Sequence, residues 1–279
     1  MPGGVATNRR ENRGLFIASG EGRANNRPIV ARRIHVPRLS PGETLLDPAQ
    51  AHHARDVLRL TDGAAVEVFD DAGRVGRGVL LIAEAGVAVR VERVDEAASQ
   101  GLSIRLTVAA AVPKGERADW MVEKLSELGV AAFIPLAAAR SVVLPEGKNK
   151  RERWARIATE AAKQSRRVGV MRVGDLTRPA DLLKGEGPFW YLSTEPEGVQ
   201  VGIAIADLPP ASNVCAFVGP EGGWTDEELR QFSNAGAQAV RLTDTILRVE
   251  TAAVAVAAVV GSLTTVRALA GHSDESPNA

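Results

Sequence analysis

Two loops in the last third of the chain contain the residue types expected of a ligand site. The first, Gly219–Trp224, has the sequence GPEGGW and follows the apolar stretch 214–218. The second, Thr243–Thr245, follows a short apolar segment that ends at Leu242. Ligands of open α/β sheets lie outside the carboxyl ends of strands, and glycine lets the backbone approach a ligand closely. We therefore expect both loops to line one pocket.

Several common catalytic motifs are absent from the sequence. It contains no G-x-x-x-x-G-K-[ST], and no G-x-G-x-x-G follows the first strand of the C-terminal region, which argues against ATP hydrolysis and dinucleotide redox chemistry. It also lacks G-x-S-x-G and H-E-x-x-H, and its four histidines are too scattered for a hydrolytic triad. Adjacent His52 and His53 lack a third ligand, so we expect no metal. Thr225 and Glu228 match a helix capping box and are interpreted as structural.

Composition predicts an ordinary protein of two domains. The 279 residues are 45% hydrophobic and 24% charged, with a net charge of zero. Basic residues are concentrated in two segments, with seven Arg against two Glu in 1–34 and eight Lys or Arg against two Glu in 148–167. Such patches suggest an anionic partner. A solvated helix face with a disordered tail remains the alternative.

The chain has one cysteine and no membrane signal. Cys215 lies in an apolar run, so we expect a buried thiol rather than a nucleophile, in a reducing, cytoplasmic compartment. The longest apolar run, 252–260, is too short to cross a bilayer, and we identify no signal peptide.

Hydrophobic patterning divides the chain into five parts. Residues 1–31 are expected to be a disordered basic tail, and 271–279 a frayed polar tail. Short strands around a helix over 48–60 predict a small β-barrel domain at 32–95, followed by a linker at 96–102. Strands alternate with helices over 103–270, which is typical of a parallel sheet covered on both faces.

The last helix carries an apolar run with no polar side. Residues 252–260 are all Ala or Val, so we expect them to be buried all round. A homodimer explains this burial, and the alternative is a central helix in a monomer.

Several segments of the sequence resemble those of a known family. Gly219–Gly223 followed by Ile246–Ala252 (ILRVETA) is similar to the paired signature of the RsmE family, the 16S ribosomal RNA uridine-N3 methyltransferases of the SPOUT superfamily. Residues 123–130 (EKLSELGV) and 160–167 (EAAKQSRR) resemble two further segments of its catalytic domain, and 52–60 (HHARDVLRL) resembles its PUA-like domain. The likeness covers about 32–268.

The resemblance implies a fold, a cofactor and a mode of assembly. The expected fold is α/β, with a SPOUT-type C-terminal domain whose mainly parallel sheet forms a deep trefoil knot, and an N-terminal PUA-like β-barrel. The family works as a homodimer and binds S-adenosylmethionine in three loops. The matching positions here are Leu192, Ser193, Thr194 and Glu195, then Gly219, Pro220, Glu221, Gly222 and Gly223, then Leu242, Thr243, Ile246 and Leu247.

One position departs from the family pattern. The family usually has Leu-Gly in the third loop, whereas Thr243 follows Leu242 here. If that glycine serves a positive φ or close cofactor approach, the loop geometry and cofactor affinity differ in this chain.

The implied reaction needs particular side chains. Uracil N3 must lose its proton, and a nearby cation would stabilise the resulting anion. Arg248 is the expected cation, and Glu250 is expected to orient it or to accept the proton. An Arg248–Glu250 salt bridge with no catalytic role is the alternative.

The implied substrate is 16S rRNA, or the 30S subunit that contains it, near the decoding site. Cationic and polar residues are expected to bind the RNA phosphates, namely Arg32, Arg33, Arg55, Arg59, Lys114, Arg140, Lys163, Gln164, Arg166 and Arg167. Two rivals remain, a SPOUT ribose 2′-O-methyltransferase and a non-catalytic ribosome assembly factor.

Overall fold

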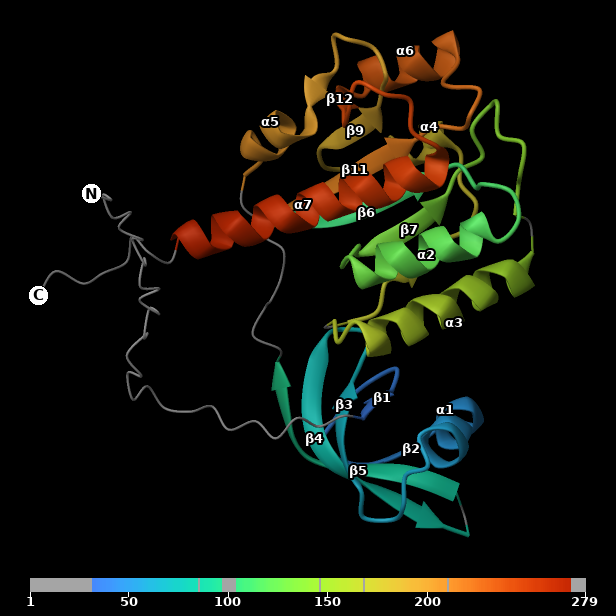
Figure 1. Ribbon diagram of the computed structural model, residues 1–279, viewed down its shortest axis with the longest axis vertical. Coiled ribbons are helices and arrows are strands. Elements are labelled where there is room, and N and C mark those ends of the chain that lie inside the picture. Colours follow the sequence, from blue (N-terminus) through green and yellow to red (C-terminus); the bar gives the residue numbers. More distant parts are fainter. Residues whose placement is uncertain are drawn as a thin grey trace, which may run out of the picture. The chain divides into compact units, whose positions relative to one another are not determined.

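The computed structural model describes residues 32–271, except residues 85, 97–103, 146, 168 and 210. The tail expected at 1–31, most of the linker expected at 96–102, and most of the tail expected at 271–279 lie outside the described residues. The described part contains a five-stranded sheet and a seven-stranded sheet, which Figure 1 shows as two separate sheets.

The five-stranded sheet forms the N-terminal part of the described chain. Its strands are β1 (Arg33–His35), β2 (Gly42–Leu45), β3 (Ala65–Phe69), β4 (Arg74–Ala83) and β5 (Gly86–Glu96). Their order is β1-β3-β4-β5-β2, with β1 parallel to β3 and the other pairs antiparallel. The apolar sides of these strands bury one core that includes Ile34, Val68, Leu80 and Val89.

Two details of this region differ from the sequence prediction. The helix expected over 48–60 is shorter, because α1 (Pro48–His52) continues as one π-helical turn, η1 (His53–Val57), and Arg59 then has a φ of 51°. Strand β5 extends through Glu96, where we expected the linker to begin, because Asp95 and Glu96 pair with β4.

The seven-stranded sheet is parallel, as the alternation of strands and helices predicted. Its strands are β6 (Ile104–Ala110), β7 (Ala132–Pro135), β8 (Arg172–Val173), β9 (Phe189–Leu192), β10 (Val199–Gln200), β11 (Ser212–Val218) and β12 (Gln238–Arg241). The order is β10-β12-β9-β11-β6-β7-β8. Strands β9, β11 and β12 are therefore neighbours, and their carboxyl ends meet at one edge.

Helices cover both faces of this sheet (Figure 1). They are α2 (Arg117–Glu127), α3 (Lys148–Gln164), α4 (Pro179–Leu182), α5 (Val201–Ala206), α6 (Asp226–Asn234) and α7 (Val249–Gly271). Strand β11 shows the two faces directly. Val214, Ala216 and Val218 join the core made with α2, α3, α5 and α7, whereas Phe217 joins a second core with Phe232 of α6. The deep trefoil knot stays a prediction.

Within the single chain, helix α7 is buried on one side only, so burial of 252–260 all round requires the second copy that we expect and stays a prediction. Ala253, Val256, Ala257 and Val260 are buried against the sheet and α2, while residues 254, 255, 258 and 259 on the other side are half-buried. This second side is also apolar. Val259 on this side still packs partly against the main core.

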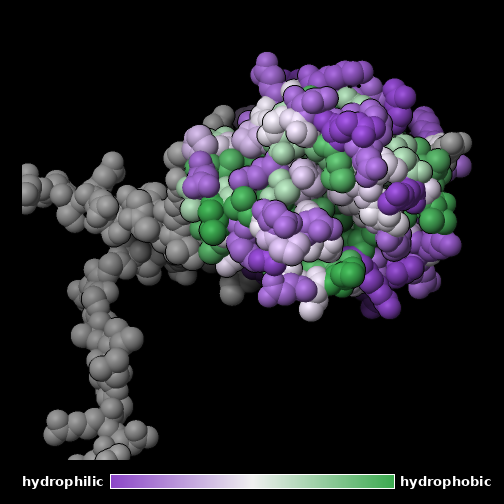
Figure 2. Space-filling view, turned by 90° about the horizontal axis from the view of Figure 1, so that it is seen from above, coloured by the Kyte–Doolittle hydropathy of each residue, from purple (hydrophilic) through white to green (hydrophobic). Residues whose placement is uncertain are grey.

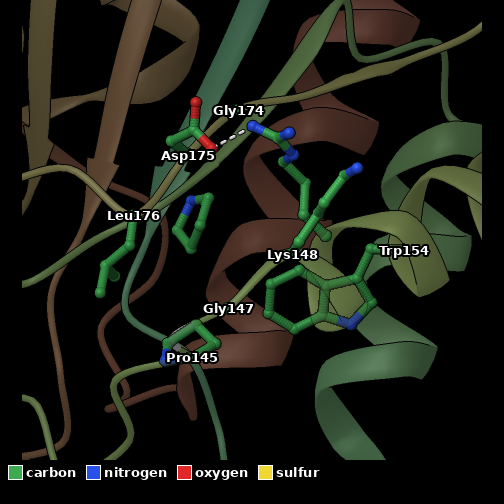
Figure 3. Close-up of a pocket in the computed structure, with 9 residues that line it drawn as sticks. Pro145, Gly147, Lys148, Trp154, Gly174, Asp175 and Leu176 are labelled. Carbon is green, nitrogen blue, oxygen red and sulfur yellow. Dashed lines mark hydrogen bonds and ion pairs between the residues drawn. The ribbon is translucent and has the colours of Figure 1, made fainter.

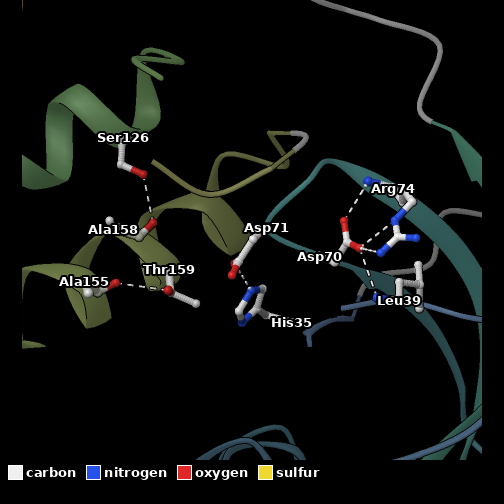
Figure 4. Close-up of polar contacts among 9 residues, drawn as sticks. All are labelled: His35, Leu39, Asp70, Asp71, Arg74, Ser126, Ala155, Ala158 and Thr159. Carbon is white, nitrogen blue, oxygen red and sulfur yellow. Dashed lines mark hydrogen bonds and ion pairs between the residues drawn. The ribbon is translucent and has the colours of Figure 1, made fainter. Parts of the chain in front are cut away.

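Polar side chains join neighbouring segments in each part of the fold (Figure 4). The Ser126 hydroxyl donates to the Ala158 carbonyl at 2.8 Å and ties α2 to α3. Buried Asp70 accepts hydrogen bonds from the N–H of Leu39 and from Arg74. Burial raises the pKa of Asp70, but these hydrogen bonds outweigh it and hold the pKa below its ordinary value.

The surface of the described part is mixed in polarity. Figure 2 shows polar side chains over most of the face that it presents, with apolar ones in small separate patches. Among the described helices, none is both long enough and apolar enough to cross a membrane. The described residues also contain no cluster of three or more His, Cys, Asp or Glu that could hold a metal ion.

Candidate functional site

Three loops at the carboxyl edge of the parallel sheet enclose one pocket. They follow β9, β11 and β12, and the pocket has a volume of about 540 Å³. Its walls consist of residues 192–195, 218–224 and 242–249 except Asp244, together with Leu229 and Ala252. All thirteen positions expected to bind the cofactor line it. The predicted pocket therefore exists, and the loop 192–195 forms its third wall.

Trp224 connects the first two loops. Its indole Nε1 donates to the Leu192 carbonyl at 3.2 Å. The same indole lies against Gly219, where an added Cβ would be 2.9 Å from Trp224 Cε2. A larger residue at 219 would therefore push the ring away from β9. This contact gives a packing reason for glycine at 219, while Gly223 has a φ of 71° that favours glycine by itself.

Buried Glu228 fixes the second loop from behind. It forms the predicted capping box of α6, since its side chain accepts from the Thr225 N–H at 2.8 Å while Thr225 Oγ1 accepts from the Glu228 N–H. Its other oxygen accepts from the Ala139 N–H at 2.8 Å. Arg140, next in the chain, donates to the Gly222 carbonyl at 2.7 Å. The segment 139–140 thus supports the glycine loop.

Glu228→Ala is expected to lower the free energy of unfolding by about 3 kcal/mol. The Thr225 and Ala139 N–H groups would lose the charged carboxylate that accepts their hydrogen bonds. Glu227→Ala on the same helix is the matched control, since Glu227 is 63% exposed and pairs only with neighbours in α6. Urea unfolding of both variants measures the difference. Equal losses would contradict this role for Glu228.

Arg248 and Glu250 have different surroundings. Arg248 is exposed and lines the pocket just before α7. Glu250 is buried, at 6% exposure, and lies outside the pocket wall. It pairs with Arg117 of α2, whose Nη1 lies 3.2 Å from Glu250 Oε1. Among the described residues, Glu250 forms an ion pair with Arg117 and none with Arg248. The catalytic roles expected for Arg248 and Glu250 stay predictions.

Cys215 behaves as predicted from its apolar segment. The thiol is unpaired by any disulfide, and burial raises its pKa to about 12. It is therefore protonated at neutral pH and unsuited to act as a nucleophile.

A second, smaller pocket of about 380 Å³ lies at the start of α3 (Figure 3). Lys148, Arg151 and the ring of Trp154 form one wall, and Asp175 faces them from the segment after β8. Arg151 forms an ion pair with Asp175, so its charge is already neutralised within the pocket wall. This pocket contains none of the residues expected from the sequence.

Comparison with known proteins agrees with the two-part architecture. The RNA methyltransferase domain family matches residues 100–261, and the RNA methyltransferase PUA domain family matches residues 46–85. The chain is 33% identical over 215 residues to ribosomal RNA small subunit methyltransferase E of Bacillus subtilis, covering 73% of this chain and 83% of the relative. It is 35% identical over 230 residues to the protein of the same name from Synechocystis, covering 80% and 75%.

The chain belongs to this methyltransferase E family. A solved structure supports the assignment, that of ribosomal RNA small subunit methyltransferase E from Neisseria gonorrhoeae bound to S-adenosyl methionine. It superposes with a TM-score of 0.72 at 28% identity, covering 83% of this chain and 97% of that one. The resemblance noted from the loops is confirmed, as are the SPOUT-like fold and the PUA domain.

Within this methyltransferase E fold, Thr243 adopts an ordinary backbone conformation. The described non-glycine residues with positive φ are Arg59, Arg166 and Ala211, so Thr243 does not need glycine for its φ. Its hydroxyl accepts from the Thr245 N–H at 3.1 Å and lies 2.9 Å from the Thr245 carbonyl oxygen. The hydroxyl therefore closes a local turn in the third loop.

Thr243→Gly is expected to weaken cofactor binding severalfold, because it removes this hydrogen-bonded turn and adds backbone freedom. Thr243→Ser keeps the hydroxyl and should bind as the unmodified protein does. Calorimetric titration with S-adenosylmethionine compares the three proteins. Tighter binding by Thr243→Gly would show instead that threonine compromises this loop.

The residues expected to bind RNA fall into two groups. Arg32, Arg55, Arg59, Lys114, Gln164 and Arg166 are exposed. Arg55 in this group also pairs with its neighbour Asp56. The other four, of which Arg140 is exposed as well, make contacts within the protein: Arg33 with Glu67 and the Ala162 and Arg167 carbonyls, Lys163 with Glu160, Arg140 with the Gly222 carbonyl, and Arg167 with the Ser126 and Val130 carbonyls. Burial lowers the pKa of Arg33 and lowers that of Arg167 to about 10.

Sequence reasoning missed several residues that shape the pocket. Leu229, Val249 and Ala252 line it, and Arg140 holds the glycine loop. Trp224 was placed in that loop, but its hydrogen bond to the Leu192 carbonyl was not expected. The position of Trp224 directly after the glycine loop was a usable signal. Arg140 lies 82 positions from Gly222, so no local pattern marks their contact.

Proposed function

We propose that this protein transfers the methyl group of S-adenosylmethionine to N3 of a specific uridine in 16S rRNA, in the decoding-site region of the small ribosomal subunit. The observation that carries the proposal is the pocket itself. Three loops at neighbouring strand ends surround it, and Arg248 stands on its wall. Membership of the methyltransferase E family supports the same reaction class.

The pocket suits S-adenosylmethionine in size and chemistry. Its volume of about 540 Å³ is within the usual range for small-molecule sites. Leu192, Leu242 and Leu247 give it apolar walls that pack on the main core, while the glycine loop gives polar backbone groups. When bound, the cofactor supplies an electrophilic methyl group on its sulfonium. The loops would hold it and exclude water from the reacting centre.

Arg248 would face the uracil. The N3–H of uracil is protonated at neutral pH, and negative charge develops on the imide as this proton leaves. A guanidinium in a pocket partly screened from water stabilises such charge more than bulk solvent does. The proton acceptor is not assigned to Glu250, because Glu250 lies off the pocket wall and is held by Arg117.

RNA capture would depend on the exposed cationic residues. Arg59 and Arg166 have φ values of 51° and 55°, a conformation that costs non-glycine residues about 1 kcal/mol or more. Arg166 directly follows the C-cap of α3, where this conformation commonly ends a helix, so the proposed binding role of both residues rests on their exposed charge. The four internally bonded residues, Arg33, Arg140, Lys163 and Arg167, would instead support the fold.

Arg166→Gln is expected to weaken rRNA binding and to reduce the slope of log affinity against log salt by about one, because one phosphate contact is lost. Cofactor affinity should not change. Filter binding at several salt concentrations, with calorimetry for the cofactor, separates the two effects. Glu160→Gln in the preceding helix α3 is the control for altered local charge, since removing an acidic group should not weaken RNA binding. Loss of cofactor affinity in Arg166→Gln would contradict the assignment.

A homodimer in the cytoplasm completes the proposal. The half-buried apolar side of α7, formed by Val254, Ala255, Ala258 and Val259, would be covered by the second copy. Sedimentation of the purified protein at micromolar concentration should give the dimer mass, and a monomer would contradict this part.

The product of the reaction tests the function. The protein is incubated with labelled S-adenosylmethionine and 30S subunits from a strain lacking the modification, and the rRNA is digested to nucleosides. We expect label in 3-methyluridine. Label in a 2′-O-methyl nucleoside would indicate a ribose methyltransferase, and binding of subunits without any label would indicate an assembly factor.

A further inference from the structure

Arg117 and Glu250 join the starts of two helices next to the pocket. Arg117 is the first residue of α2, and Glu250 is the second residue of α7. Arg117 Nη1 donates to Glu250 Oε1 at 3.2 Å. The Arg117 side chain is 43% exposed, whereas that of Glu250 is only 8% exposed. The pair therefore anchors a buried carboxylate from the protein surface.

This carboxylate is poorly satisfied for a buried charge. Glu250 Oε2 is buried and has no hydrogen-bond partner in the described structure. A buried charged group with an unpaired oxygen is unfavourable for stability, even where its partner compensates part of the charge. The start of α7 offsets some of this cost, because helix N-termini favour negative charge. If Glu250 only filled space in the core, a neutral residue at this position would stabilise the fold at least as well.

The pair determines which side of α7 faces the pocket. Val249 and Ala252 lie three positions apart on one helix side and line the pocket, as does Arg248. Glu250 is on a different side, turned toward Arg117. The first turn of α7 is also closed by a hydrogen bond from the Ala252 N–H to the Arg248 carbonyl at 2.8 Å. Rotation of this turn would therefore move Arg248 relative to the pocket.

We propose that Arg117 is a positioning residue for methyl transfer. It holds Glu250, and Glu250 fixes the first turn of α7, from which Arg248 faces the substrate. Arg117 itself touches neither cofactor nor substrate in this arrangement. The inference rests on the proposed role of Arg248, and it explains why an incompletely satisfied buried carboxylate occupies this place.

Steady-state kinetics and thermal unfolding of Arg117→Gln, Arg117→Lys and Glu250→Gln test the inference, with wild-type activity on 30S subunits established first. We expect both Gln variants to lose about tenfold to a hundredfold in kcat, as misplaced groups commonly do, with S-adenosylmethionine affinity unchanged. Arg117→Lys should recover part of kcat. Glu250→Gln should keep or raise Tm while kcat falls, which a merely structural role would not produce.

A double variant and a control variant complete the test. The double variant Arg117→Gln with Glu250→Gln should lose no more kcat than the worse single variant, because both act through one contact. Arg178→Gln, which breaks an exposed pair with Asp181 on α4, should leave kcat unchanged. Folded Gln variants with wild-type kcat would overturn the inference alone, whereas wild-type protein that forms no 3-methyluridine would overturn the proposed function.

Discussion

Arg248→Ala is expected to lower kcat for methyl transfer by about a hundredfold to a thousandfold, the usual effect of removing one group that stabilises developing charge. Affinity for S-adenosylmethionine should change little, since many other residues form the pocket wall. The side chain is exposed and has no ion-pair partner among the described residues, so its removal should not lower Tm. Single-turnover rates with saturating cofactor and 30S subunits measure the effect on the chemical step.

Arg248→Lys tests whether the positive charge of Arg248 or the planar shape of its guanidinium matters for the rate. Lysine keeps the positive charge but lacks the planar guanidinium that can donate to two acceptors at once. We expect an intermediate rate for this variant. If Arg248→Ala retained nearly full kcat and lost only RNA affinity, Arg248 would be a phosphate contact rather than a group that faces the uracil.

Gly219→Ala is expected to weaken S-adenosylmethionine binding by about tenfold to a hundredfold. The new Cβ would lie 2.9 Å from the Trp224 ring, which must move and give up its hydrogen bond to the Leu192 carbonyl. Overpacking of this kind costs about 1–3 kcal/mol, and 1.4 kcal/mol corresponds to tenfold in affinity. The loops after β9 and β11 would no longer be held together. Calorimetric titration measures the loss.

Gly202→Ala provides the matched control. Gly202 lies in α5, where an added Cβ would meet only Leu263 Cδ1 at 3.9 Å, an ordinary contact. The control should bind the cofactor normally and unfold at the same temperature or slightly higher, because alanine favours helix. Normal binding by Gly219→Ala would show that the Trp224 contact does not shape the site.

The sequence predicted the pocket because its signals are local. A glycine loop after an apolar strand, with a second loop before Arg248, indicated two walls at strand ends. The third wall came from the resemblance to the family, which implied the positions after Leu192, and in the structure these positions follow β9 and line the pocket. Parallel strands in one sheet necessarily bring such loops to a common edge.

Contacts between distant segments were not predictable in this way. Arg117 and Glu250 are 133 positions apart, and Arg33 and Arg167 are 134 apart. The sequence does not distinguish an arginine that binds phosphate from one that binds a backbone carbonyl. Arg33 and Arg167 were therefore grouped with exposed arginines, although burial and internal hydrogen bonds distinguish them. The short strands β8 and β10 have two residues each and show no usable alternation.

A structure of the protein with bound S-adenosylmethionine tests the central claim most directly. We expect cofactor density in the pocket formed by the loops after β9, β11 and β12, against Gly219–Gly223 and Leu242–Leu247. Density in the other pocket, between Trp154 and Asp175, would contradict it, as would a loop pocket that stays empty at saturating cofactor.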